Sequence, residues 1–224
     1  MTGITRNNTS TARSAFFYYS LAGALIGWFA VILQLWLIIV NRVVSIPETV
    51  LRFFSYFTIL SNILAAICYT CALSGRAVPF TRFFTKPATL TAITVYISVV
   101  GIVYNIILRS LWDPVGWQQL ADELLHSLSP LLFIVYWLVF IPKRTLRWSD
   151  VFSWLLFPLV YLIWSIIHGR LNGFYPYPFI DAATIGYPKL MLNSLILLIA
   201  FLGLSLLFVG IGRLMSRAAR PAGE

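Results

Sequence analysis

The sequence predicts an all-α polytopic membrane protein, a bundle of six transmembrane helices joined by short loops. Hydrophobic residues make up 60% of the 224 positions and charged residues only 10%, and the mean hydropathy is +0.87. Water-soluble domains carry about 25% charged residues. The composition therefore indicates a chain surrounded by lipid, with no length left for a separate soluble domain.

Six apolar runs each come close to the roughly 20 residues that a helix needs to cross a bilayer. None of them contains Asp, Glu, Lys or Arg. We predict spans at residues 16–40, 53–73, 88–108, 124–141, 151–168 and 190–212. Charged residues, Pro and Gly separate the runs, as expected where helices end. The predicted membrane domain covers residues 16–213, between a polar tail (1–15) and a basic tail (214–224).

The positively charged residues indicate the orientation of these spans. Eleven of the sixteen Lys and Arg residues fall in the two tails and in the second and fourth loops, and five fall in the other loops. Cytoplasmic loops carry the excess of Lys and Arg. We therefore predict that both termini are cytoplasmic, and we expect an integral protein of a bacterial cytoplasmic membrane.

The net charge of +9 is also compatible with nucleic-acid binding. Because the basic residues lie almost entirely between apolar runs, attraction to an anionic membrane face explains them better. We expect no nucleic-acid partner. The first 14 residues are polar and the run that follows lacks a small-residue cleavage site, so we expect no cleavable signal peptide.

Strongly polar side chains gather at one depth of the predicted bundle. With both termini cytoplasmic, they lie in the outer halves or at the outer ends of the second to sixth spans. They are Thr58, Asn62, Asn105, Arg109, Glu123, His126, His168 and Asn193. Polar groups in a bilayer are costly and face a bundle interior or a cavity. We predict one polar pocket that opens toward the outer leaflet, although interhelical hydrogen bonds or an interfacial belt would also account for single members.

Three stretches of the sequence resemble one membrane protein family. They are residues 54–62 (FSYFTILSN), 123–130 (ELLHSLSP) and 175–181 (YPYPFID). The first two are similar to the threonine and histidine segments of the androgen-induced and androgen-dependent TFPI-regulating membrane proteins. The third is typical of bacterial six-span relatives of that family. The resemblance covers most of the chain, from the first span to the sixth.

The resemblance implies an intramembrane threonine hydrolase that cleaves fatty acid esters of hydroxy fatty acids or similar lipid esters. The family's catalytic pair carries over to Thr58 and His126. Around that pair the sequence departs from the animal proteins, with Ser61 and Asn62 after the threonine and Ser127 after the histidine. The nucleophile and base types are kept, whereas the substrate's identity is left open.

The chemistry of these residue types agrees with an acyl transfer. A threonine hydroxyl needs a base to become a nucleophile, and histidine, with a reference pKa of about 6.5, can supply one. Asn62, Asn105 and Asn193 are candidates to stabilise the oxyanion, and Glu123 is a candidate to orient His126. Arg109 is a candidate to bind a substrate carboxylate, although an Arg at a helix end often only extends its charged group to the membrane–water interface. His168 is kept as a further substrate-binding candidate.

The sequence is also compatible with other functions. The main alternative is a non-catalytic lipid-binding or transport protein. Cys68 and Cys71 form a C-x-x-C pair, but on the cytoplasmic side, where disulfide-forming chemistry is not expected, so two small core residues are the better interpretation. The two histidines lack the second pair that a two-haem bundle needs. Without a zinc-protease motif or a carboxylate cluster, we expect neither a metal nor another cofactor.

Overall fold

The computed structural model describes residues 3–218, with side chains from residue 11 onward. Within these residues every regular element is helical, which confirms the all-α class. Six helices are long and apolar enough to cross a membrane, which indicates an integral membrane protein. They cover Thr11–Val40, Phe57–Ser74, Pro87–Leu111, Trp117–Phe140, Asp150–Asn172 and Ala182–Ala218.

The helix ends differ from the predicted ones in two informative places. The predicted span at 53–73 is interrupted, because α2 (Ile46–Phe54) ends before α3 (Phe57–Ser74) begins. Ser45 caps α2 and Pro47 occupies its first turn, a combination that favours a helix start. The fourth span begins at Trp117, earlier than the predicted residue 124. Its first turns are the polar helix α6 (Trp117–Glu123).

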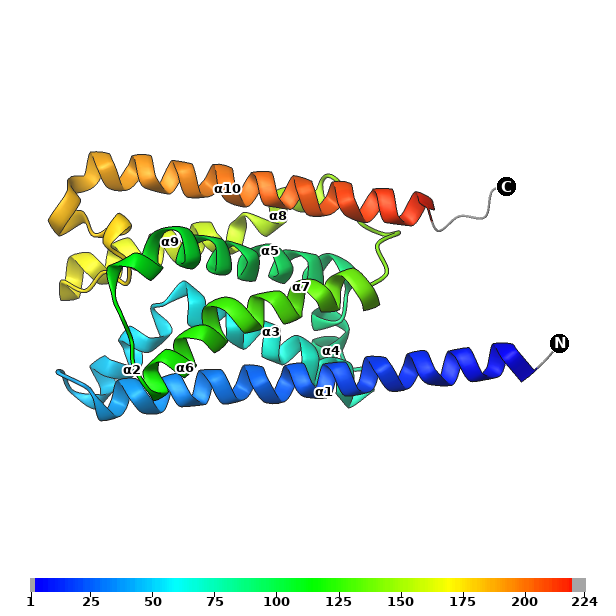
Figure 1. Ribbon diagram of the computed structural model, residues 1–224. Helices are drawn as coiled ribbons and strands as arrows, with labels where there is room; N and C mark the ends of the chain where they lie inside the picture. Colours follow the sequence, from blue (N-terminus) through cyan, green and yellow to red (C-terminus); the bar gives the residue numbers. More distant parts are fainter. Residues whose placement is uncertain (1–2, 219–224) are drawn as a thin grey trace. The chain divides into compact units, whose positions relative to one another are not determined.

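The described chain forms two compact units. The first unit holds residues 3–34 and Ser61–Ile141, and the second holds Leu35–Leu60 and residues 142–218. In the first unit, α5 (Pro87–Val103) packs along α7 (Ser129–Phe140) (Figure 1). Their contact includes a buried hydrogen bond of 2.8 Å from the Trp137 indole to the Thr91 hydroxyl.

In the first unit, α1 (Gly3–Val40) and α3 also pack closely against each other. Gly23 leaves space that the Tyr69 ring fills, since a Cβ there would lie 2.5 Å from the ring. One turn later, a Cβ on Gly27 would lie 3.2 Å from the Cβ of Ala66. Small residues that allow backbones to approach closely are the usual basis of helix packing in membranes.

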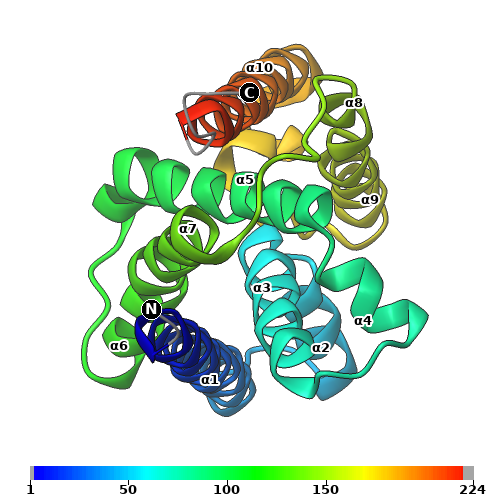
Figure 2. The same ribbon diagram turned by 90° about the vertical axis from the view of Figure 1, so that its right-hand side faces the viewer.

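The second unit contains α2, the first turn of α3, α8 (Asp150–Trp154), α9 (Leu156–Asn172) and α10 (Ala182–Ala218). α10 lies beside α8 and α9 (Figure 2). It is kinked at Gly186, whose φ of 74° is open to glycine but costly for other residues. The loop before α10 includes the short 3-10 helix η4 (Pro178–Ile180) and supplies aromatic side chains to the site described below.

Candidate functional site

The candidate residues fall into two groups, one in each compact unit. The first unit holds Asn62, Asn105, Arg109, Glu123 and His126. The second unit holds Thr58, His168 and Asn193. The single pocket predicted from the sequence, and with it the pairing of Thr58 with His126, stays a prediction.

His126 is held by Asp122, one turn earlier in the chain. Its Nδ1 lies 2.9 Å from the backbone carbonyl of Asp122 and 3.2 Å from a carboxylate oxygen of the same residue. The Asp122 side chain is buried, with 5% of its surface exposed. Both acceptors favour the tautomer that carries its proton on Nδ1, so Nε2 is the nitrogen that can accept a proton.

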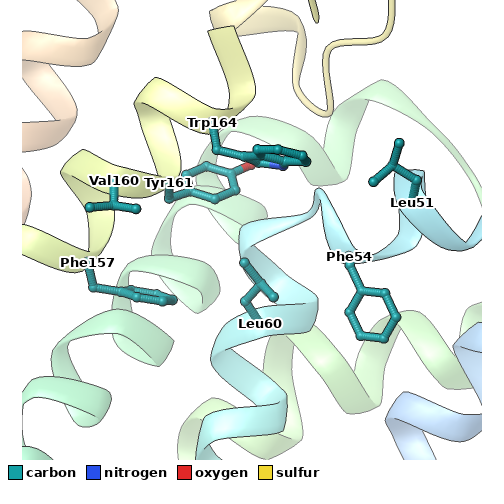
Figure 3. A pocket seen from close by; sticks show the side chains of 7 residues that line it. All are labelled: Leu51, Phe54, Leu60, Phe157, Val160, Tyr161 and Trp164. Carbon is teal, nitrogen blue, oxygen red and sulfur yellow. The ribbon is translucent and has the colours of Figure 1, made fainter. Parts of the chain in front are cut away.

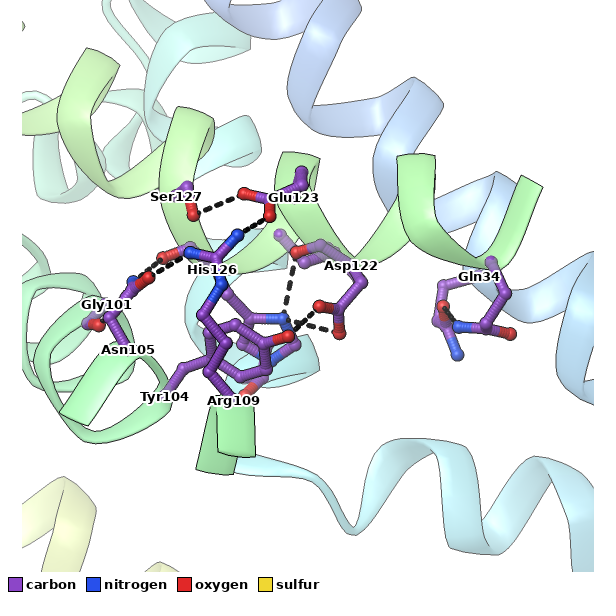
Figure 4. Close-up of polar contacts among 12 residues, drawn as sticks. Gln34, Gly101, Tyr104, Asn105, Arg109, Asp122, Glu123, His126 and Ser127 are labelled. Atoms are coloured by element: carbon purple, nitrogen blue, oxygen red, sulfur yellow. Dashed lines mark hydrogen bonds and ion pairs between the residues drawn. The ribbon is translucent and has the colours of Figure 1, made fainter. Parts of the chain in front are cut away.

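Tyr104 completes this arrangement from the facing helix (Figure 4). Its hydroxyl donates a hydrogen bond to the other carboxylate oxygen of Asp122. Its ring stacks on the imidazole of His126, with centroids 3.9 Å apart and planes 15° from parallel. The imidazole is therefore fixed both at its edge, by Asp122, and across its face, by Tyr104.

Two π-helical segments carry these residues. Tyr104 begins η1 (Tyr104–Leu108), and His126 is the central residue of η3 (Leu124–Leu128). The two segments contact each other. Single π-helical turns inside longer helices are rare and occur frequently at functional sites. Their pairing around His126 supports a functional role for this part of the first unit.

Glu123 does not orient His126. Its carboxylate forms an ion pair with Arg109 and accepts a 2.7 Å hydrogen bond from the Ser127 hydroxyl. Asp122 takes the orienting position instead. In a helix with a π-turn the side chain four residues before the histidine comes to face the ring, whereas Glu123 is directed to the neighbouring Arg109.

The asparagines of the first unit contact the backbone beside His126. Asn105 donates to the carbonyl of Gly101 at 2.9 Å and to that of His126 at 3.4 Å, and its side-chain oxygen accepts from Arg109. Asn62, with 1% of its surface exposed, donates to the carbonyl of Leu125 at 3.1 Å. Both amides brace the π-helical segment η3.

In the second unit, Thr58 meets the phenol of Tyr177. The Tyr177 oxygen lies 3.2 Å from both the backbone nitrogen and the hydroxyl of Thr58. Thr58 is the second residue of α3, so its N–H is one of those that a helix start leaves without an intrahelical partner. Tyr177 accepts that N–H and can donate its own proton to the Thr58 hydroxyl.

The surroundings keep this phenol protonated. Burial raises the pKa of Tyr177 to about 12, and burial also raises the pKa of the neighbouring Tyr56. The rings of Tyr56 and Tyr177 meet edge to face, with centroids 5.8 Å apart. Tyr177 therefore remains a hydrogen-bond donor throughout the neutral pH range.

An open apolar pocket of about 340 Å³ lies in the same unit as Thr58 (Figure 3). It is lined by Leu51, Phe54, Leu60, Phe157, Val160, Tyr161 and Trp164. Tyr161 also donates a 2.9 Å hydrogen bond to the carbonyl of Ser55, which fixes the break before α3. The pocket has the size and lining expected for part of a hydrocarbon chain.

The two remaining candidates of the second unit have different surroundings. His168, with 2% of its surface exposed, stacks on Trp164 at 5.6 Å. Within the described residues neither of its ring nitrogens has a hydrogen-bond partner. Asn193 donates to the carbonyl of Phe179 at 2.8 Å and so anchors the loop that carries Tyr177.

The described residues contain neither a metal-binding group of side chains nor a disulfide bond. No group of three His, Cys, Asp or Glu side chains there is placed to hold a metal ion. Cys68 and Cys71 are both buried free thiols.

Sequence reasoning missed three residues of these sites. Asp122 lies four residues before His126, a spacing that places two side chains on one helix face, so the signal was present in the sequence. Tyr177 stands in the 175–181 motif, which gave no indication of a contact with Thr58. Tyr104 had no signal, because its contact with His126 depends on how two separate helices pack.

Comparison of the chain with protein-family models, with curated proteins and with solved structures gives no match.

Proposed function

We propose that the protein is an intramembrane hydrolase of lipid esters, with Thr58 as the nucleophile and His126 as the general base. Its substrates are fatty acid esters of hydroxy fatty acids or similar acyl esters. The observation that carries the proposal is the contact of His126 Nδ1 with the buried carboxylate of Asp122. A carboxylate that holds an imidazole by Nδ1 is the arrangement with which hydrolases keep Nε2 ready for a proton.

The position of Thr58 supports its role as the nucleophile. It lies in the first turn of α3, where the partial positive charge of the helix start stabilises a negative charge that develops on its oxygen. A hydrogen bond from the Tyr177 phenol to the same oxygen acts in the same direction. The apolar pocket in the same unit offers space for the acyl chain.

The proposed reaction has two steps. In the first, the Thr58 oxygen bonds to the ester carbonyl carbon while His126 Nε2 takes the hydroxyl proton. The bond from that carbon to the alcohol oxygen then breaks, and His126 returns the proton to the leaving alcohol. In the second, water attacks the acyl-threonine with His126 again as base, the carboxylic acid leaves, and Thr58 regains its proton.

The membrane setting forms part of the proposal. We infer that both termini are cytoplasmic, from the excess of Lys and Arg on that side, and that the membrane is a bacterial cytoplasmic membrane. With this orientation Thr58, His126 and His168 lie toward the outer half. An apolar substrate then reaches the site from the lipid.

Covalent labelling tests the nucleophile directly. A fluorophosphonate probe is expected to label the detergent-purified protein through the Thr58 oxygen, which displaces fluoride from phosphorus, and mass spectrometry should find the adduct on a peptide that contains Thr58. Thr58→Ala should abolish the adduct. Thr94→Ala removes another buried span threonine, whose hydroxyl bonds only within its own helix, and should leave labelling unchanged.

The alternative function has a distinct outcome in this experiment. The open apolar pocket would equally suit a non-catalytic lipid-binding or transport protein. Absence of labelling in the wild type, combined with retention of a fluorescent fatty acid ester without its cleavage, would favour that alternative.

Replacement of Tyr177 is expected to weaken catalysis without impairing substrate binding. Tyr177→Phe removes one neutral hydrogen bond to the Thr58 oxygen, so kcat should fall by about tenfold while KM stays unchanged. Tyr175→Phe, in the same loop, is the matched control and should retain kcat. A fall in both variants, or a rise in KM alone, would contradict a role for Tyr177 at the nucleophile.

A further inference from the structure

A small internal cavity lies in the first unit. It is lined by Gly23 and Gly27 of α1, by Asn62, Ala66 and Tyr69 of α3, and by Ser129 of α7, among others. Its volume is about 10 Å³. It lies where α1 and α3 approach each other closely.

Two polar groups on the cavity wall lack a partner. The hydroxyls of Tyr69 and Ser129 are buried, and neither has a hydrogen-bond partner within the described residues. Tyr69 exposes 3% of its surface and Ser129 exposes 7%. A buried hydroxyl without a hydrogen bond destabilises the fold, because the loss of its bonds to water is not compensated. Nearly all such groups in native proteins are bonded to protein atoms or to an ordered water.

The cavity has the properties of a site for one water molecule. A bound water molecule needs a cavity with at least about 10–15 Å³ of space for the centre of a water-sized sphere, and it needs two to four polar partners. Tyr69 and Ser129 come from different helices and line the same space, and we infer from this that one water molecule bonds to both hydroxyls. Empty cavities in proteins are apolar instead, whereas Tyr69 and Ser129 are among the residues that line this one.

We propose that this cavity binds one ordered water molecule that joins α3 to α7 inside the membrane. The Tyr69 phenol donates to the water oxygen, and the water donates to the Ser129 oxygen. Asn62, which also lines the cavity, is fixed by its bond to the Leu125 carbonyl. The water site thus adjoins the residues that brace η3, and it is independent of whether Thr58 acts as a nucleophile.

X-ray radiolytic footprinting with mass spectrometry tests the site in the full-length, detergent-purified protein. Hydroxyl radicals form from bound water, so Tyr69 should be oxidised despite its burial. Trp137 is the dry control, because it is intrinsically reactive, has 0% exposure and is already bonded to Thr91. A brief exchange into ¹⁸O water before irradiation would show whether the oxygen added to Tyr69 comes from a slowly exchanging molecule.

Two variants make the outcome decisive. Ser129→Ala removes one partner of the water, and Gly27→Ala adds a methyl at the cavity wall, 3.2 Å from the Cβ of Ala66. Each should lower Tyr69 oxidation several-fold while Trp137 stays protected, in preparations that remain monodisperse with an unchanged Tm. Tyr69 protection equal to that of Trp137 in the wild type would overturn the proposal, as would unchanged Tyr69 oxidation in either folded variant.

Discussion

Thr58→Ala is expected to lower kcat for ester hydrolysis by about a thousandfold, because it removes the atom that forms the acyl intermediate. The measurement is turnover of short-chain nitrophenyl esters and of a branched fatty acid ester by the purified protein. Thr58→Ser keeps a hydroxyl and should retain a substantial part of the activity. Thr94→Ala should match the wild type, since the hydroxyl it removes bonds only to Leu90 of its own helix.

His126→Ala should cause a loss of similar size, because the hydroxyl of Thr58 stays unreactive without a base. The double variant should be no worse than either single one, as expected for residues that act as one unit. His168→Ala tests which of the two histidines is the general base, since His168 lies in the same unit as Thr58. Loss of activity in His168→Ala with retention in His126→Ala would transfer the role of base to His168. Unchanged turnover in Thr58→Ala and His126→Ala would refute the hydrolase proposal altogether.

Asp122→Asn is expected to lower kcat by about a hundredfold or more, a smaller loss than removal of Thr58 or His126. The carboxylate accepts the Nδ1 proton of His126 and would stabilise the imidazolium that forms during the reaction. An asparagine can instead donate to Nδ1, which moves the remaining proton to Nε2 and blocks its use as a base. The change should appear in kcat, with KM largely unaffected.

Glu123→Gln is the matched control for that variant. It makes the same chemical change at the adjacent residue, whose carboxylate contacts Arg109 and Ser127 rather than the imidazole. We expect a much smaller change in kcat. Equal losses in Asp122→Asn and Glu123→Gln would mean that the local charge, and not the orientation of His126, is what matters. The kcat of Tyr104→Phe should fall between those of the two variants, because it removes the hydrogen bond to Asp122 and keeps the ring that stacks on His126.

The all-α class and the existence of six helices long and apolar enough to cross a membrane followed from composition and from the lengths of the apolar runs. These properties are encoded locally, because each span must satisfy its own backbone hydrogen bonds in lipid. The ends of the spans were less accurate. The interruption of the helix at Ser55 and Tyr56 was not predicted, because both residues stand within a continuous apolar run. It is fixed by Tyr161, which bonds to Ser55 from a distant helix.

The sequence by itself determined the class, the spans and the candidate polar residues of this protein. Only the tertiary structure decided which partners those residues have: Asp122 and Tyr104 at His126, and Tyr177 at Thr58. Side-chain spacing within one helix can suggest a neighbour such as Asp122. A contact between distant helices depends instead on how their faces pack, and local apolar patterning carries no information about that choice.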